Sequence, residues 1–520
     1  MRRTTLSGVA AVTGALVGLV VAVAPAGAAV GGPVPARAPS PVQPGCNGAT
    51  QTGTNFLNAE VEPYLATDPT RPGNLVGVWQ QDRWSNGGAN GLIARQSTDA
   101  GRTWRDTVNP PFSHCAGGSA RNGGDYERAS DPWVTFAPNG DAYFISLSFN
   151  DSNPTNAILV SKSRDGGHQW GPIRTLIRDT DPSAFNDKES ITADPTDSQR
   201  VYAVWDRGFQ ADPTSNDFLE PTYFSRTVNG AASFEPAHAI FDPGVNNGTI
   251  GNIVNVLPDG TLLCSFDLFL GDALNVALIR STDHGATWSA DPTFVDQLGT
   301  IGVVDPRDGA DVRTGDILPI LTVDPRAGHR DVYAVWQDAR FSGGQADQIA
   351  FSRSTDGGVT WSPAVRVSPP GNVQAFTPTV QVNAAGEIAI AYYDFTFTTA
   401  TAPELATDYW VTRSADGGRT FSPRERLTGT SFDMRTAPDA GGKFIGDYEG
   451  LSAGGNRFDN LYVATNSGAG TNLTDTFYAA VSGPRPTVGP QAATSGVAQP
   501  KRSPRTPGRL PHPGGPVAVH

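Results

Sequence analysis

The sequence predicts an all-β protein built from one repeated unit, and three observations lead to this prediction. Glycine (59) and proline (42) are abundant while only 17% of the 520 residues are charged, which is typical of a chain with many tight turns. The 24 Phe, 12 Tyr and 10 Trp provide enough apolar surface for a core and exclude a wholly disordered chain. A short motif also returns at intervals, so the chain need not be divided into several unrelated domains.

Residues 1–28 are predicted to be a signal peptide. Arg2 and Arg3 precede an apolar run at 9–23, and small residues follow it at 26–28. The run is short for a bilayer anchor, and no later segment is long and apolar enough to span. We therefore expect a secreted protein without a membrane span.

Proline-rich stretches without hydrophobic periodicity flank the repeated region. We interpret residues 29–47 as a linker and residues 483–520 as a disordered tail. Neither stretch contains Asp or Glu, so the region between them is more acidic than the net charge of −13 indicates. Such a charge argues against general binding of nucleic acid.

The three cysteines fit an exported protein. Cys46 and Cys115 lie in glycine-rich loops and are the predicted disulfide pair. Cys264 lies in an apolar run and is predicted to be a buried free thiol.

The repeated motif is an octet with the pattern S-x-D-x-G-x-T-W. Its third position recurs 54 to 73 residues apart and is occupied by Asp99, Asp165, Asn229, Asp283, Asp356 and Asp416. β-rich runs precede each octet, and Asp-Pro or Asn-Gly turns separate them. A unit near 60 residues therefore predicts a four-stranded blade, with the octet joining its third and fourth strands.

A further unit without an octet follows the sixth. Residues 446–455, 460–467 and 476–481 resemble its first three strands, and residues near 48–57 are expected to supply the fourth. We therefore predict seven blades closed by an N-terminal strand, with six blades as the alternative.

The octet resembles the Asp-box, or BNR repeat, of sialidases and related β-propellers. This resemblance implies an Asp-box β-propeller over residues 48–482. The octet aspartates are expected to be structural, because a carboxylate can accept backbone N–H bonds within its turn and every unit repeats it. Sialidases also carry an Arg-Ile-Pro motif before the first octet, and this chain has none.

In a propeller the loops before the first strands and after the second strands open on one face, and here these loops are rich in charge. Sialidases bind the substrate carboxylate with three arginines, and the resemblance suggests Arg128, Arg313 and Arg435 for this role. The alternative is that each arginine pairs with an acidic residue of its own loop. Trp84 is a candidate for stacking on a sugar ring.

The resemblance also implies a tyrosine nucleophile beside a glutamate, and Tyr448 with Glu449 is the candidate pair. Adjacent residues of a strand point to opposite faces, so this pair requires a kink. The candidates for general acid and base are Asp131, Asp187 and Glu189. The alternative is that these three cap turns or hold a structural cation. No metal-ligand spacing occurs, so no cofactor is expected, although structural calcium stays open.

We therefore expect a sialidase-like glycoside hydrolase, of exo-sialidase type, that acts on an extracellular acidic glycan as a monomer. The first alternative is a polysaccharide lyase that uses a Tyr and an Arg beside a uronate carboxylate. The second alternative is a non-catalytic propeller that binds a glycan or a protein.

Overall fold

The computed structural model describes residues 1, 29–37, 39–211, 214, 216–466 and 470–483. Within these residues the protein is all-β, with 34 strands and three short 3-10 helices, η1 (His114–Ala116), η2 (Arg340–Ser342) and η3 (Met434–Thr436). No helix in this part of the chain has the length and apolar character needed to cross a membrane. The predicted signal peptide and nearly all of the predicted tail lie outside the described residues.

Antiparallel strands that pair in sequence order form seven units in the described chain. The first strands of the units are β3 (Glu60–Thr67), β7 (Arg128–Phe136), β11 (Ala184–Ala193), β16 (Asn247–Val256), β22 (Ile320–Val323), β26 (Ala375–Val382) and β32 (Gly450–Gly454). The second strands are β4 (Leu75–Arg83), β8 (Ala142–Phe149), β12 (Val201–Gln210), β17 (Leu262–Leu270), β23 (Val332–Asp338), β27 (Ile388–Asp394) and β33 (Arg457–Thr465). The third strands are β5 (Ala89–Ser97), β9 (Asn156–Ser163), β14 (Thr222–Thr227), β18 (Ala273–Ser281), β24 (Gln348–Ser354), β28 (Ala406–Ser414) and β34 (Thr474–Ser482).

The outer strands are shorter. They are β6 (Arg105–Asp106), β10 (Arg174–Asp179), β15 (His238–Phe241), β19 (Thr293–Gln297), β25 (Val365–Arg366) and β29 (Glu425–Arg426). Two small strands, β13 (Phe218–Leu219) and β30 (Phe432–Asp433), pair with β12 and β28. A separate small sheet joins β20 (Val303–Val304), β21 (Asp311–Arg313) and β31 (Lys443–Phe444).

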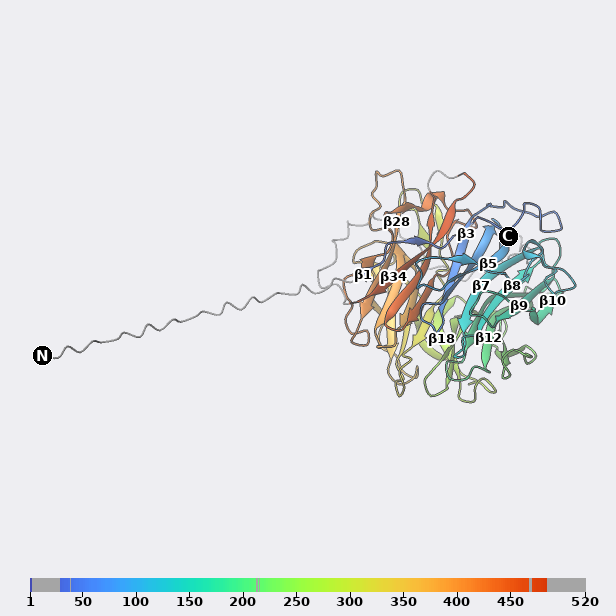
Figure 1. Ribbon diagram of the computed structural model, residues 1–520, viewed down its shortest axis with the longest axis horizontal. Coiled ribbons are helices and arrows are strands. Elements are labelled where there is room, and N and C mark those ends of the chain that lie inside the picture. Colours follow the sequence, from blue (N-terminus) through green and yellow to red (C-terminus); the bar gives the residue numbers. More distant parts are fainter. Residues whose placement is uncertain (2–28, 38, 212–213, 215, 467–469, 484–520) are drawn as a thin grey trace.

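The first strands contact one another in cyclic order. Each packs against the first strand of the next unit, and β32 packs back against β3. Figure 1 accordingly shows the blue N-terminal strands beside the red C-terminal ones. The first strands of all seven units therefore surround one central channel.

An N-terminal segment supplies the outer strand of the last unit, but it is not the predicted one. The strands β1 (Ala29–Val30) and β2 (Val34–Pro35) pair with β34, within the stretch that was interpreted as a linker. Residues 48–57, which were expected in this place, form only an isolated bridge from Asn55 to Trp84. The expectation for 48–57 was wrong because the disulfide between Cys46 and Cys115 holds this segment beside the first two units.

The cysteine predictions are confirmed. Cys46 and Cys115 form the disulfide, and Cys264 is a buried free thiol.

The octets close their turns with the same hydrogen bonds in each unit that has one. In the first octet the hydroxyl of Ser97 accepts a bond from the amide of Gly101, and Asp99 accepts bonds from the amide and hydroxyl of Thr103. Corresponding bonds recur at Asp165, Asn229, Asp283, Asp356 and Asp416. The carboxylates are therefore engaged within the turns, as expected for structural residues.

Candidate functional site

A bulge interrupts the first strand in five units and holds one residue in the left-handed region. These residues are Glu62 (φ 52°), Asp131 (φ 50°), Lys188 (φ 47°), Gly251 (φ 70°) and Thr377 (φ 48°). A non-glycine residue in this conformation costs about 1–3 kcal/mol and is most common at functional sites. Three of the four non-glycine residues are charged, so this part of the channel is a candidate functional site.

Three carboxylates from different parts of the chain meet at one buried ammonium group. The Nζ atom of Lys188 lies 2.9 Å from Asp131 Oδ1, 2.8 Å from Asp447 Oδ2 and 3.5 Å from Glu62 Oε1. All four residues are buried. We call these four residues the lysine cluster.

Two arginines lie next to the lysine cluster. Arg313 donates from Nε to Asp447 Oδ1 at 3.0 Å and from Nη2 to the other oxygen of the same carboxylate. The guanidinium carbons of Arg313 and Arg83 lie 4.6 and 4.7 Å from the centre of the Phe444 ring. The side chain of Arg313 is 26% exposed, so the cluster approaches solvent on this side.

The carboxyl groups of the lysine cluster differ in their affinity for protons. Burial raises the pKa of Glu62 to about 8, and burial also raises the pKa of Asp131. Burial opposes the charge of Asp447 as well, but Arg313 and Lys188 outweigh it and hold the pKa of Asp447 well below its usual range. The environments of Glu62 and Asp447 therefore shift their pKa values in opposite directions.

More carboxyl groups lie beside the lysine cluster. Asp187 and Asp206 face each other across β11 and β12. Both oxygens of Glu189 and of Asp206 are buried without a hydrogen-bond partner among the described residues, and burial raises the pKa of each. Glu189 also lines a cavity of about 20 Å³ together with Lys188, Asn252, Trp133 and Tyr448. A cavity of this size holds about one water molecule.

The structure brings the three acid/base candidates Asp131, Asp187 and Glu189 to this region, but it separates Tyr448 from Glu449. The hydroxyl of Tyr448 donates to the carbonyl of Pro132 at 3.2 Å, while Glu449 accepts a bond of 2.8 Å from Tyr393. The predicted nucleophile pair does not form, because these two residues lie just before β32 and their side chains bond to different partners. Burial also raises the pKa of Tyr448 well above its usual value.

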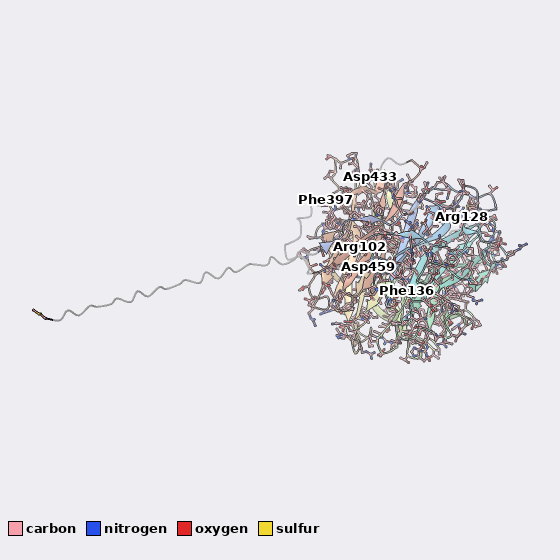
Figure 2. The ribbon with its side chains drawn as sticks, in the orientation of Figure 1. Arg102, Arg128, Phe136, Phe397, Asp433 and Asp459 are labelled. Atoms are coloured by element: carbon pink, nitrogen blue, oxygen red, sulfur yellow. A yellow bond between two sulfur atoms is a disulfide. The ribbon has the colours of Figure 1, made fainter. Side chains whose placement is uncertain are left out.

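Arg128 lies in a different network from Arg313. It is fully buried, forms an ion pair of 3.2 Å with Asp151, and donates to the carbonyls of Gly87 and Thr52. The guanidinium of Arg128, which is labelled in Figure 2, lies over Trp84 at 4.6 Å from the ring centre. Arg128 also bonds to Gln51 and Thr52 and so anchors the 48–57 segment. These contacts bury the guanidinium of Arg128, whereas Trp84 stays half-buried.

Arg435 lies in a third network. It pairs with Asp305 and, at 2.9 Å, with Asp308. The predicted clamp of three arginines is therefore not assembled, and only Arg313 joins the lysine cluster. The alternative of pairing within each loop is wrong as well, because the carboxylates that pair with these arginines come from other loops.

Sequence reasoning assigned no role to Glu62, Lys188, Arg83 or Asp447. One sequence signal could have linked Glu62 to Asp131. Each is followed by a proline and an aromatic residue at the same place in its unit. The bulge that unites them depends on strand register, which the spacing of the octets does not reveal.

The channel contains a larger cavity, of about 750 Å³, on the other side of an aromatic layer. Tyr64 stacks on Trp133 with ring centres 3.6 Å apart, and Tyr448 meets Trp133 edge-on at 5.3 Å. Trp133 and Tyr448 line both this cavity and the small one beside Lys188, so they form the wall between them.

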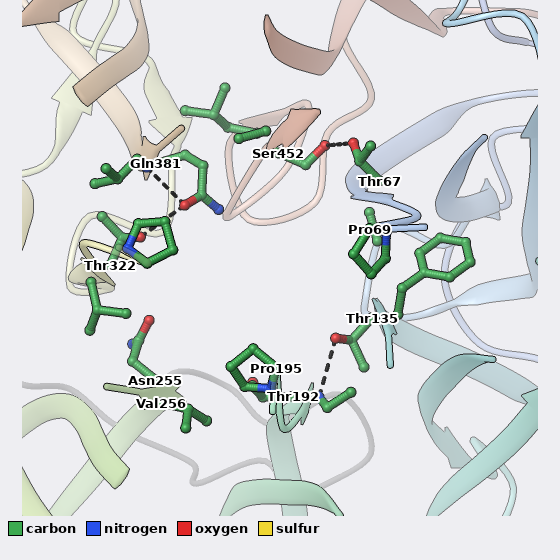
Figure 3. A pocket seen from close by; sticks show the side chains of 18 of the residues that line it. Thr67, Pro69, Thr135, Thr192, Pro195, Asn255, Val256, Thr322, Gln381 and Ser452 are labelled. Carbon is green, nitrogen blue, oxygen red and sulfur yellow. Dashed lines mark hydrogen bonds between the residues drawn. The ribbon is translucent and has the colours of Figure 1, made fainter. Parts of the chain in front are cut away.

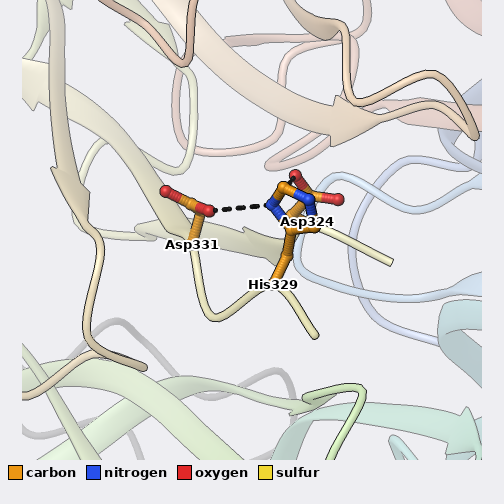
Figure 4. Close-up of side chains that lie close together, drawn as sticks. All are labelled: Asp324, His329 and Asp331. Carbon is orange, nitrogen blue, oxygen red and sulfur yellow. Dashed lines mark hydrogen bonds and ion pairs between the residues drawn. The ribbon is translucent and has the colours of Figure 1, made fainter. Parts of the chain in front are cut away.

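A group of metal-ligand type occurs at Asp324, His329 and Asp331 (Figure 4). His329 Nδ1 lies 3.3 Å from Asp331 and 3.5 Å from Asp324. Arg326 already pairs with Asp324, which occupies the same turn position as Asp68 of the first unit. We therefore interpret these three residues as structural parts of the turn rather than as a metal site.

Comparisons with known proteins give the following similarities. No family model matches the chain. The chain is 28% identical over 273 residues to the xyloglucanase Xgh74A of Acetivibrio thermocellus. The aligned region covers 49% of this chain and 29% of that protein. Among solved structures, it resembles the Hadza microbial sialidase Hz136 (TM-score 0.44, 15% identity, 75% of this chain and 72% of that chain). It also resembles the α-L-arabinanase of Penicillium chrysogenum (TM-score 0.40, 12% identity, 82% of this chain and 98% of that chain). The chain spans less than a third of the length of the curated relative.

Proposed function

We propose that this protein is a secreted glycoside hydrolase on a seven-bladed propeller, and that the lysine cluster is its catalytic centre. The observation that carries the proposal is that Glu62 and Asp447 meet at Lys188 with their pKa values driven in opposite directions. Two carboxyl groups with separated pKa values are what glycoside hydrolysis requires. The similarity to a xyloglucanase and the cyclic contacts of the first strands support the proposal.

Each carboxyl group has a role that follows from its environment. Glu62, whose pKa is raised, is assigned as the general acid, while Asp447, whose pKa is lowered, is assigned as the nucleophile or base. Both contact one nitrogen, at 3.5 and 2.8 Å. The two contacting oxygens are therefore closer than the separation of about 6.5 Å or more found in inverting enzymes. This spacing favours a retaining reaction.

The proposed substrate is a neutral glycan rather than an acidic one. Arg128, Arg313 and Arg435 are each paired with carboxylates of the protein, so the positive charge that would bind a sialic acid or a uronate is already matched. The catalytic centre also carries several carboxyl groups, which would repel an anion.

The test is hydrolysis of a panel containing xyloglucan, arabinan and sialyl-lactose by the purified protein and its variants. We expect release of neutral sugar, and a loss of about 10²–10⁴-fold in rate for Glu62→Gln and for Asp447→Asn. Asp291→Asn changes an exposed carboxylate and is the matched control, expected to keep full activity. Full activity of both cluster variants, with circular dichroism confirming their fold, would contradict the assignment.

A non-catalytic glycan-binding propeller is the second candidate, and the burial of the lysine cluster favours it. Glu62, Asp131, Lys188 and Asp447 are all buried and in contact with one another. Binding to a glycan of the panel without release of any product would support this second function.

A further inference from the structure

The wall of the larger cavity carries one short polar side chain from the first strand of every unit. They are Thr67, Thr135, Thr192, Asn255, Thr322, Gln381 and Ser452, and Figure 3 shows them around an open centre. Some of their hydrogen bonds link neighbouring units, as from Thr322 to Gln381 at 3.0 Å and between Thr67 and Ser452 at 2.6 Å. Each unit therefore contributes a hydroxyl or amide group to the wall.

One group of this wall is a donor without a protein acceptor. The Nδ2 atom of Asn255 is buried and has no hydrogen-bond partner among the described residues. A buried donor left in this state costs about 1–3 kcal/mol unless a bound molecule accepts its bond. The side chain of Asn255 lines the channel (Figure 3), but its Nδ2 atom is enclosed by the protein, so an occupant of the channel meets the rest of this side chain.

The inner end of the cavity is aromatic. Tyr64, Trp133 and Tyr448 close it towards the lysine cluster, and Ile253 and Ile320 flank them. Tyr64 is only partly buried, so its ring is available for contact. Aromatic rings provide apolar contact area, and the ring of polar side chains lies above them.

The cavity offers no free charge to a ligand. The charged residues that line it are Asp68 and Glu449. Asp68 accepts bonds from Thr70, Arg71 and Asn74. Glu449 accepts one bond from Tyr393, its Oε2 atom has no partner among the described residues, and burial raises its pKa, which favours the uncharged form. A charged ligand would lose its hydration in this cavity without gaining a partner of opposite charge, which is costly. A neutral polar ligand carries no charge that needs such a partner.

We infer that this end of the channel is a second binding site, for a neutral mono- or disaccharide. A sugar has an apolar face that can lie on the aromatic end and hydroxyl groups that can bond to the surrounding ring of hydroxyls and amides. The amides of Asn255 and Gln381 both donate and accept, which suits a hydroxyl group. The cavity volume of about 750 Å³ lies within the range of small-molecule sites. The site is distinct from the proposed catalytic centre, and binding there does not require hydrolysis.

Isothermal titration calorimetry with D-xylose, L-arabinose and cellobiose tests this inference, with N-acetylneuraminate as the charged comparison. We expect millimolar or tighter binding of at least one neutral sugar and weaker binding of the anion. Asn255→Leu, Gln381→Leu and the double variant are expected to weaken binding, the double variant by at least about tenfold. Gln199→Leu makes the same chemical change at an exposed position outside the lining and is expected to bind normally.

The proposed catalytic centre and the proposed sugar site can be tested separately. Glu62→Gln and Asp447→Asn are expected to bind the sugar like the wild type, because they lie beyond the aromatic wall. The inference is overturned if no neutral sugar binds, if N-acetylneuraminate binds as tightly, or if the folded Asn255 and Gln381 variants bind unchanged. If Glu62→Gln and Asp447→Asn lose binding while the channel variants keep it, the sugar site is the lysine cluster instead.

Discussion

At the scale of single residues, Lys188 is the side chain on which the candidate site depends. Its ammonium group contacts three carboxylates, and it occupies a left-handed backbone conformation within β11. Removing one partner of a buried charge network leaves the others uncompensated, which costs more than the pair contributes when intact. The identity of this residue therefore affects both the fold and the site.

Lys188→Met is expected to lower the free energy of unfolding by about 3–5 kcal/mol, because it leaves three buried carboxyl groups without their cation. Urea denaturation measures the loss. Lys162→Met is the matched control, since Lys162 pairs with Asp141 at 2.7 Å but is more exposed. For this control we expect a loss of about 1 kcal/mol or less. Equal losses in the two variants would contradict the role of Lys188.

The raised pKa of Glu62 predicts a particular dependence of stability on pH. Between its usual value of 4.5 and about 8, the folded protein binds this proton and the unfolded chain releases it. Stability therefore falls as pH rises through this window, with a slope of at most about 1.4 kcal/mol per pH unit from this group. Glu62→Gln removes the titration, so its stability should rise relative to the wild type over the same window.

Urea denaturation at several pH values measures this difference. Glu404→Gln changes an exposed carboxyl group, and its curve should run parallel to that of the wild type. If the curve of Glu62→Gln is also parallel to the wild type, Glu62 does not titrate as the structure indicates.

At the scale of elements, the segment that contains β31 lies over the lysine cluster. Phe444 packs with Val61 and Ala440 and contacts Arg83 and Arg313, and β31 pairs in parallel with β21. The loop that leads into the first strand of the last unit is thus attached to the loop before β22. For the proposed hydrolysis at Asp447, we expect the substrate to enter past Phe444, beside the partly exposed Arg313.

Phe444→Ala is expected to increase the rate of glycan hydrolysis several-fold, because it removes the ring that separates the cluster from solvent. Hydrogen exchange of residues 440–447 should become faster in the same variant. Phe397→Ala is the control, since Phe397 also lies beneath an arginine, Arg426, but belongs to another loop. A rate equal to or below that of the wild type, together with unchanged exchange, would show that the segment does not restrict access.

The elements were more predictable from the sequence than the site. The octets repeat a local pattern of hydrogen bonds, so their spacing located six of the seven units, and apolar runs located the last. Site residues depend on distant pairing that no local pattern contains. Arg435, for example, binds Asp305 across 130 residues, and Arg313 binds Asp447 across 134. Asp131, Asp187 and Glu189 were predicted because charge is rare in this chain and was expected to concentrate in the loops before first strands, whereas the structure places them within β7 and β11.

At the scale of the whole molecule, the two ends of the described chain complete one unit together. β1 and β2 cover the edge of β34, and the amides of Gly31 and Ala36 donate to the carbonyls of Ala480 and Thr476. An uncovered strand edge is prone to pair with other chains. The N-terminal segment therefore both completes the last unit and protects its edge.

A variant that begins at residue 37 is expected to be less stable than one that begins at residue 29. It lacks β1 and β2, so it loses several backbone hydrogen bonds at about 0.5–1.5 kcal/mol each and exposes the edge of β34. We expect a loss of at least about 2 kcal/mol in urea denaturation, together with dimers or larger aggregates in light scattering. The variant beginning at residue 29 keeps both strands and serves as the control. If both variants show the same stability and stay monodisperse, the seven units hold together without the N-terminal strands.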